Sequence, residues 1–161
     1  MIKAGVLTIS NKGFRGQRNN ESGAVVVDLL SKAGYRVEKQ DIVPDDQERI
    51  ARCLIDWVDQ DGLRLIVTTG GTGVSPTDVT PEAMLSVIDY QIPGMAEAMR
   101  AASLKKTPHA MLSRAIAGVR GTSLIVNLPG SPDGARDNLS VILPALSHGL
   151  AKVGGDTSDC V

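Results

Sequence analysis

Aromatic side chains are nearly missing from this chain of 161 residues, which contains one Trp, two Tyr and one Phe. A platform that stacks nucleic-acid bases needs several aromatic rings, so we expect no such surface. An excess of one charge is missing too, because 17 Lys and Arg oppose 18 Asp and Glu, for a formal net charge of -1. Proteins that bind nucleic acid or an anionic membrane carry a basic excess, so neither partner is expected.

Long apolar runs and closely spaced cysteines are also lacking. No run approaches the roughly 18 apolar residues of a membrane span, and residues 1–5 lead into an apolar run without the form of a signal peptide. Cys53 and Cys160 lie far apart and have no metal-ligand spacing. We therefore expect a protein of the reducing cytoplasm.

Glycine, by contrast, is abundant, with 17 residues, and the core must be built from Val, Ile, Leu, Ala and Met. A chain of this length suits one domain with a core of its own. We assign that domain to residues 1–153. The small and polar residues 154–161 are expected to form a flexible tail.

Apolar runs alternate with segments of helical periodicity along the chain. This alternation predicts an α/β fold with three layers, α/β/α, and a mostly parallel central sheet. A mobile loop is expected over 12–22, and a short helical piece over 111–118. Strands are expected at 5–9, 35–43, 63–69 and 124–128, and helices at 26–33, 45–61, 80–88, 95–104 and 132–150.

Three helix starts carry capping signals. Asp45 followed by Glu48 fits a capping box with Asp in the Ser/Thr position. Thr80 followed by Pro81 supplies an N-cap and a favoured first helical residue. Ser131 either caps the last helix or presents that helix's N-terminus to an anion.

Ligands of parallel α/β sheets bind beyond the carboxyl ends of the strands. In this sequence those ends are rich in glycine, hydroxyl groups and carboxylates, whereas the strands that lead to them are apolar. The four segments concerned are 10–11, 44–46, 68–73 and 127–131. The contrast predicts a small-molecule site at this edge of the sheet.

The segment Gly70-Gly71-Thr72-Gly73 is the first candidate for ligand binding. Glycines allow positive φ angles and let backbone N–H groups converge on one point, which suits a phosphate. The segment is neither a P-loop, because no Lys-Ser/Thr pair follows, nor a dinucleotide fingerprint, because the third glycine is missing. The alternative is a tight turn from strand to helix.

Asp78 follows this segment closely, and a carboxylate beside a phosphate site calls for a cation. Mg²⁺ is the usual mediator, held by one or two carboxylates together with substrate phosphates. Asp45 or Asp46, at a neighbouring strand end, can supply the second carboxylate. The alternative is purely structural, with Asp45 capping its helix and Asp78 capping a turn.

Taken together, the motifs resemble those of the MogA/MoaB family of molybdenum-cofactor biosynthesis, from the first strand to the last helix. They are Thr68-Thr69-Gly70-Gly71-Thr72-Gly73 with Asp78-Val79-Thr80-Pro81-Glu82-Ala83, then Ser103-Leu104-Lys105-Lys106-Thr107-Pro108 leading to Leu112-Ser113-Arg114-Ala115, and Asn127-Leu128-Pro129-Gly130-Ser131-Pro132. The resemblance implies the three-layer fold, a homotrimer and the adenylylation of molybdopterin with Mg-ATP. A molybdate-insertion protein would be the downstream partner.

The resemblance also implies residue roles. Asp45 and Asp78 would be catalytic and would hold Mg²⁺. Many relatives carry Asp at the position of Asn11. The residues expected to bind molybdopterin and ATP are Ser10, Thr69, Gly70, Gly71, Thr72, Gly73, Ser75, Ser113, Asn127, Pro129, Gly130 and Ser131.

Two other functions remain open at this stage. One is a MoaB-like protein that binds or carries molybdopterin without catalysis, against which both aspartates speak. The other is the related domain of molybdate-insertion proteins, which is less favoured because those chains are much longer.

Overall fold

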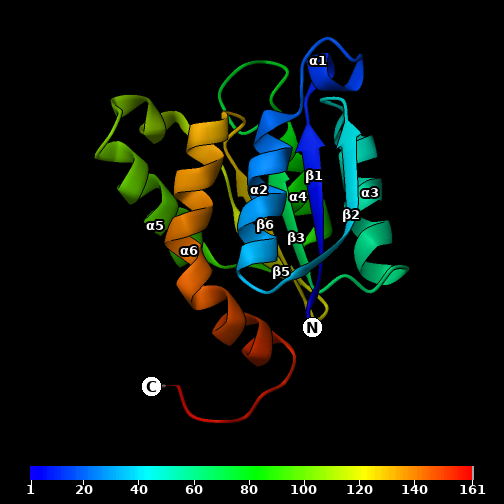
Figure 1. Ribbon diagram of the computed structural model, residues 1–161, viewed down its shortest axis with the longest axis vertical. Coiled ribbons are helices and arrows are strands. Elements are labelled where there is room, and N and C mark those ends of the chain that lie inside the picture. The colour runs from blue at the N-terminus through cyan, green and yellow to red at the C-terminus, as the bar shows by residue number, and fades with distance from the viewer. Residues whose placement is uncertain (161) are drawn as a thin grey trace.

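Apolar runs form the inner strands of a six-stranded sheet in the computed structural model, which describes residues 1–160 (Figure 1). Strands β1, β2, β3 and β6 pair in parallel, and β5 pairs antiparallel with both β6 and β4. Their order is β2-β1-β3-β6-β5-β4. Their bounds are β1 Lys3–Ile9, β2 Arg36–Val43, β3 Leu65–Thr69, β4 Tyr90–Gln91, β5 Ala117–Arg120 and β6 Ser123–Leu128.

Helices cover both faces of this sheet. One face packs against α2 (Glu21–Lys32), α5 (Pro93–Leu104) and α6 (Pro132–Val153). The other packs against α3 (Gln47–Asp59) and α4 (Thr80–Val87). The predicted three layers and mostly parallel sheet are therefore confirmed.

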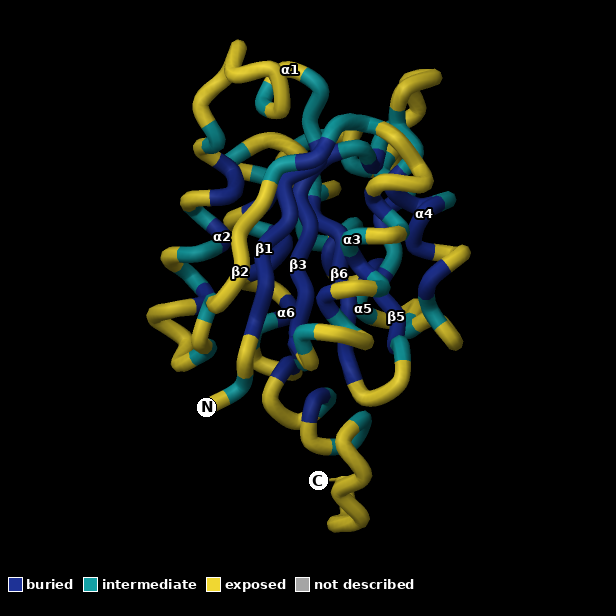
Figure 2. Tube along the Cα trace, turned by 90° about the vertical axis from the view of Figure 1, so that its right-hand side faces the viewer, coloured by how far each residue is buried: buried dark blue, intermediate teal, exposed yellow. Residues whose placement is uncertain are grey.

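Strand alternation explains why the core has two halves. Val6 packs in the α2, α5 and α6 layer, whereas its neighbour Leu7 packs in the α3 and α4 layer. The same alternation separates Val67 from Ile66, because successive strand residues point to opposite faces. Figure 2 shows the buried inner strands β1, β3 and β6 beside the more exposed edge strand β2.

Two segments differ from the sequence prediction. The prediction of a mobile loop over 12–22 is wrong, because this segment contains most of a short helix, α1 (Asn11–Phe14), and the start of α2. The hydroxyl of Ser10 begins α1 by accepting a hydrogen bond from the N–H of Gly13 at 3.0 Å. The helical piece expected over 111–118 is also wrong: a 3-10 helix, η1 (Pro108–Leu112), precedes strand β5 there.

Two of the three predicted caps are displaced by one residue. Asp46, not Asp45, caps α3, and its carboxylate accepts a hydrogen bond from the N–H of Arg49 at 3.0 Å. Val79 precedes α4, so Thr80 is its first residue rather than its cap. Ser131 caps α6 as predicted. The displacement at α3 matters because it leaves the Asp45 carboxylate free for another role.

The chain ends beyond α6, whose last residue is Val153. Residues 154–160 form no helix or strand, and residue 161 of the expected tail lies outside the described part of the chain. Within residues 1–160, no helix combines the length and the hydrophobicity that crossing a bilayer requires.

Strand register brings the predicted site segments together. Ile9 of β1 aligns with Val43 of β2, and Thr69 of β3 aligns with Leu128 of β6. The four strands therefore end at the same edge of the sheet. The chain leaves β1 toward α2 on one face and β3 toward α4 on the other. A crevice at such a divergence is the usual ligand site of a parallel sheet.

Candidate functional site

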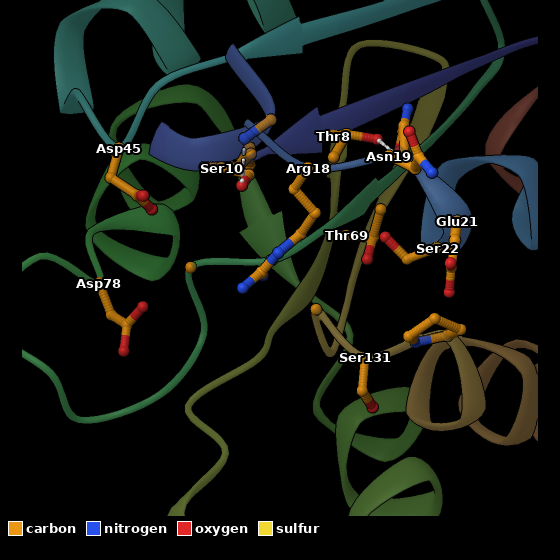
Figure 3. Close-up of a pocket in the computed structure, with 17 residues that line it drawn as sticks. Thr8, Ser10, Arg18, Asn19, Glu21, Ser22, Asp45, Thr69, Asp78 and Ser131 are labelled. Carbon is orange, nitrogen blue, oxygen red and sulfur yellow. Dashed lines mark hydrogen bonds between the residues drawn. The ribbon is translucent and has the colours of Figure 1, made fainter. Parts of the chain in front are cut away.

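The carboxyl ends of β1, β2, β3 and β6 surround a cavity of about 650 Å³ (Figure 3). The first residues of α2 and α6 complete its wall. The cavity therefore lies where the parallel topology predicts it. The predicted site residues that line it are Ser10, Asp45, Thr69, Gly70, Gly71, Asp78, Gly130 and Ser131.

The glycine segment has the backbone shape that only glycine adopts without strain. Gly70 and Gly71 have φ angles of +103° and +68°. A Cβ atom on Gly70 would also collide with the carbonyl oxygen of Ile9. Within residues 1–160, the N–H groups of Gly71, Thr72 and Gly73 form no hydrogen bond. Gly71 lines the cavity, so its N–H is a free backbone donor there, as an anion site requires.

Asp45 is positioned by a reciprocal pair of hydrogen bonds with Asn11. The N–H of Asn11 donates to Asp45 Oδ2 at 3.3 Å, and the N–H of Asp45 donates to Asn11 Oδ1 at 2.9 Å. Asn11 therefore joins the first turn after β1 to the end of β2. An amide at this position supplies the acceptor for Asp45 without adding a third negative charge.

Burial raises the pKa of the Asp45 carboxyl above its ordinary value of 3.8. The hydrogen bond from Asn11 lowers this pKa, and the nearby Asp78 carboxylate raises it. Asp78 lies across the same cavity, where its Oδ2 atom accepts a hydrogen bond from the N–H of Ser75 at 3.0 Å. The two carboxylates are therefore close enough to repel one another.

A cation would relieve this repulsion. Within residues 1–160, neither Asp45 nor Asp78 forms an ion pair with Lys, Arg or His. In the same described range, no three His, Cys, Asp or Glu side chains gather into a metal site. Mg²⁺ needs only one or two carboxylates when substrate phosphates complete its coordination. The pair thus fits a Mg²⁺ ion that binds together with a phosphate ligand.

Arg114 holds the glycine segment and Asp78 in place. Its backbone N–H donates to the carbonyl of Thr72 at 2.7 Å, and its Nε donates to the carbonyl of Gly73 at 2.8 Å. Its Nη2 donates to the carbonyl of Asp78 at 2.9 Å, while Nη1 pairs with Glu82 at 2.7 Å. One side chain therefore fixes both ends of the loop that carries the candidate phosphate and metal groups.

Several predicted residues do not line the cavity. Thr72 and Gly73 lie behind it, in the segment held by Arg114, and Ser75 reaches it only through its bond to Asp78. The Ser113 hydroxyl accepts from the N–H of Ala115 at 3.3 Å. The remaining two, Pro129 and Asn127, also lie outside the lining.

Asn127 is fully buried and its side chain already has partners. Its Nδ2 donates to the hydroxyl of Thr68 at 3.0 Å, and its Oδ1 accepts from the N–H of Ile116 at 3.3 Å. These bonds tie β6 to β3 and to the segment before β5. The structure thus gives Asn127 a structural role behind the site.

Sequence reasoning missed one wall of the cavity, formed by the loop before α2. Its lining residues are Arg18, Asn19, Asn20, Glu21 and Ser22. Asn20 caps α2, accepting a hydrogen bond from the N–H of Gly23 at 3.0 Å and another from the Thr8 hydroxyl at 2.9 Å. Asparagine is a frequent N-cap residue, so Asn20 was a signal in the sequence for a helix that begins here.

The cavity combines three chemical features in one place. It has the carboxylates of Asp45 and Asp78 without an ion-pair partner in residues 1–160, the free backbone N–H of Gly71, and the N-termini of α2 and α6. Carboxylates can hold a divalent cation, while backbone donors and helix N-termini favour phosphate oxygens. The arrangement therefore suits a phosphorylated ligand that binds with a divalent cation.

Comparison with known proteins agrees with this chemistry. A family model described as "Probable molybdopterin binding domain" matches residues 5–148. The chain is 40% identical over 91% of its length to the molybdopterin adenylyltransferase of Helicobacter pylori strain J99, of which it covers 85%. The crystal structure of the molybdopterin biosynthesis enzyme MoaB from Thermus thermophilus matches with a TM-score of 0.92 and 47% identity, covering 97% of this chain and 98% of that one.

Some relatives are much longer. The chain is 36% identical over 98% of its length to the molybdenum cofactor synthesis protein cinnamon of Drosophila melanogaster. It spans 26% of that protein and 22% of the gephyrin of Dictyostelium discoideum. The chain thus corresponds to about a quarter of the length of these two relatives.

Proposed function

Since the chain belongs to the MogA/MoaB family of molybdenum-cofactor biosynthesis, we propose that it transfers an adenylyl group from Mg-ATP to molybdopterin. The products are adenylylated molybdopterin and pyrophosphate. The observation that carries the proposal is the cavity in which Asp45 and Asp78, both without an ion-pair partner in residues 1–160, lie beside the glycine segment.

The reaction joins two anionic groups. An oxygen of the molybdopterin phosphate attacks the α-phosphorus of ATP, forming a P–O bond. The bond from the α-phosphorus to its bridging oxygen breaks, and pyrophosphate leaves with the electron pair. No general base is needed, because the attacking phosphate is already ionised near pH 7. The protein therefore has to position both groups and offset their charge.

The residues at the cavity divide these tasks. Asp45 and Asp78 would hold Mg²⁺, which supplies positive charge to the reacting phosphates. The free N–H of Gly71 would donate to a phosphate oxygen. The exposed hydroxyls and backbone groups at the rim would orient the remainder of the substrates. Those rim residues are Ser10, Gly130 and Ser131.

The second candidate is a protein that binds molybdopterin without catalysis. The similarity to a structure named MoaB is the observation that favours this second candidate. Against it stand the two aspartates, which a simple binding protein would not need. Such a protein would bind molybdopterin but would form no adenylylated product.

We also propose a homotrimer in the cytoplasm that passes its product to a molybdate-insertion protein. Ala96 and Met99 of α5 do not support it, because both are buried in the chain's own core. Support comes instead from Leu104, Met111 and Leu112, which are large, apolar and exposed at α5 and η1. Light scattering that finds a monomer at micromolar concentration would overturn the trimer.

The direct test is incubation of the protein with molybdopterin, ATP and Mg²⁺, followed by mass spectrometry. We expect adenylylated molybdopterin and pyrophosphate in equal amounts. Omitting ATP, or replacing Mg²⁺ with EDTA, should abolish both. Tight molybdopterin binding with no product under the complete conditions would favour the carrier function.

A further inference from the structure

Arg18 is the one Lys or Arg among the described residues that line the cavity. Three carboxylates, Glu21, Asp45 and Asp78, line the same cavity, yet Arg18 forms an ion pair with none of them. Figure 3 shows its side chain reaching into the cavity between the Asp45 and Asp78 carboxylates and the hydroxyls on the opposite side. Its charge is therefore available to a ligand.

Ser22 lies on that opposite side and is 8% exposed. Its hydroxyl forms no hydrogen bond with any residue in the range 1–160, although it lines the cavity. Among the described residues no buried side-chain nitrogen or oxygen lacks a hydrogen-bond partner, so the Ser22 oxygen is reached by the solvent that fills the cavity. Its placement in Figure 3, beside Thr69 and facing the cavity, makes this hydroxyl available to a ligand.

The N-termini of two helices on the Ser22 side of the cavity also favour an anionic ligand. α2 has 12 residues and α6 has 22, and both begin at the cavity wall. The first N–H groups of a helix lack partners within the helix, and the aligned peptide dipoles favour an anion there. Ser131 uses its oxygen to accept from the N–H of Gly134, so its hydroxyl hydrogen stays free to donate.

We propose that Arg18 and Ser22 form a phosphate subsite that works without Mg²⁺. The proposal rests on the proposed function, which brings two phosphorylated substrates into one cavity. Mg²⁺ held by Asp45 and Asp78 would supply charge to the phosphates next to it. A phosphate on the Ser22 side would lie near the Glu21 carboxylate and needs a counter-charge of its own, which Arg18 can provide. The guanidinium fork of arginine matches two phosphate oxygens at once. The phosphate belongs either to the departing pyrophosphate or to molybdopterin.

The first test is calorimetric binding of inorganic pyrophosphate in EDTA. Arg18→Gln should weaken binding about tenfold and Ser22→Ala about fivefold, as expected for a charged and a neutral hydrogen bond. Arg15→Gln is the matched control, because Arg15 lies in the same loop, is exposed and does not line the cavity. Asp78→Asn should retain binding without Mg²⁺. Wild-type affinity in Arg18→Gln, or an equal loss in Arg15→Gln, would overturn the subsite.

Steady-state kinetics identify the source of the phosphate. If the subsite holds the departing pyrophosphate, Arg18→Gln raises the KM for ATP alone, and if it holds the other substrate, it raises the KM for molybdopterin alone. Unchanged KM values for both substrates would contradict the proposal. Pyrophosphate binding that depends on Arg18 in a protein that makes no adenylylated product would uphold the subsite and overturn the proposed function.

Discussion

Arg114 and Asp78 are joined by a hydrogen bond of 2.9 Å, which runs from the guanidinium to the backbone carbonyl of Asp78 and does not involve the Asp78 carboxylate. The same guanidinium binds the carbonyl of Gly73, five positions earlier. The loop between these residues is therefore held at both ends, and its carboxylate faces the cavity because of a residue outside that cavity.

Replacing Arg114 should show whether this residue positions Asp78 in addition to stabilising the fold. Arg114→Gln removes hydrogen bonds to two carbonyls and the ion pair with Glu82, and should lower the free energy of unfolding by about 1–3 kcal/mol. It should also raise the Mg²⁺ concentration needed for half-maximal activity, because Asp78 is no longer fixed. Urea unfolding and a Mg²⁺ titration measure the two effects. The control is Arg136→Gln, which removes only a surface pair with Asp133. An unchanged Mg²⁺ requirement in Arg114→Gln would refute the positioning role.

The raised pKa of Asp45 predicts how activity responds to acid. Protonated Asp45 cannot hold Mg²⁺, so kcat/KM should fall with decreasing pH at a midpoint above 3.8. Additional Mg²⁺ should move that midpoint to lower pH, because the ion and the proton compete for one carboxylate. The pH profile at two Mg²⁺ concentrations measures this shift. If the midpoint does not change with the Mg²⁺ concentration, the fall of kcat/KM in acid comes from the protonation of another group.

The raised pKa of Asp45 also predicts how the stability of the protein depends on pH. This dependence has the opposite sign to that of a carboxylate in an ion pair. Burial raises the folded-state pKa above 3.8, so the folded state holds the proton more tightly than the unfolded state. Without Mg²⁺, the contribution of Asp45 to stability should therefore be fully present below pH 3.8 and be lost as the pH rises through the raised value. Asp45→Asn should remove this decline. Parallel stability curves for wild type and Asp45→Asn would contradict it.

Asn127 should behave as a structural residue. Asn127→Ala leaves the Thr68 hydroxyl and the N–H of Ile116 without their partner, and should cost about 2–3 kcal/mol of unfolding free energy. Ser123→Ala offers a comparison at another buried polar residue of β6, with one side-chain bond to Leu63. Urea unfolding measures both. A loss of molybdopterin affinity in Asn127→Ala without any loss of stability would instead place Asn127 in direct contact with substrate.

Gly70 should not tolerate a side chain. Its φ of +103° and the nearby carbonyl of Ile9 make Gly70→Ala both strained and crowded. We expect a loss of about 1–3 kcal/mol together with weaker phosphate binding. Gly94→Ala is the matched control, since a Cβ there has open space and an ordinary φ. Thermal melting and pyrophosphate titration measure the two effects, and a Gly70→Ala protein as stable as Gly94→Ala would contradict the strain.

The sequence predicted the layers well because the inner strands are continuous apolar runs. It failed at β5, where Ala117 and Gly118 give no clear period, and at β4, which has two residues. It also placed the α3 cap one residue early. Asp45 and Asp46 both suit a cap chemically, and only the path of the chain decides between them.

The site was predicted to a similar extent. Asp45, Asp78 and Gly70 could be located because the ends of parallel strands must meet at one edge. Arg18 and Ser22 could not, because their approach depends on how the loop before α2 folds back over β1. Asn127 shows the converse, since its position in the sequence pointed to the site and its packing directs it away from the cavity.

The most direct measurement is the rate of adenylylated molybdopterin formation by wild type, Asp78→Asn and Asp133→Asn, with Mg²⁺ and ATP present. Asp133 is an exposed aspartate at the start of α6 and does not line the cavity. We predict a fall of at least about 100-fold in Asp78→Asn, with the fold intact, and an unchanged rate in Asp133→Asn. Near-normal turnover by a folded Asp78→Asn protein would contradict the account.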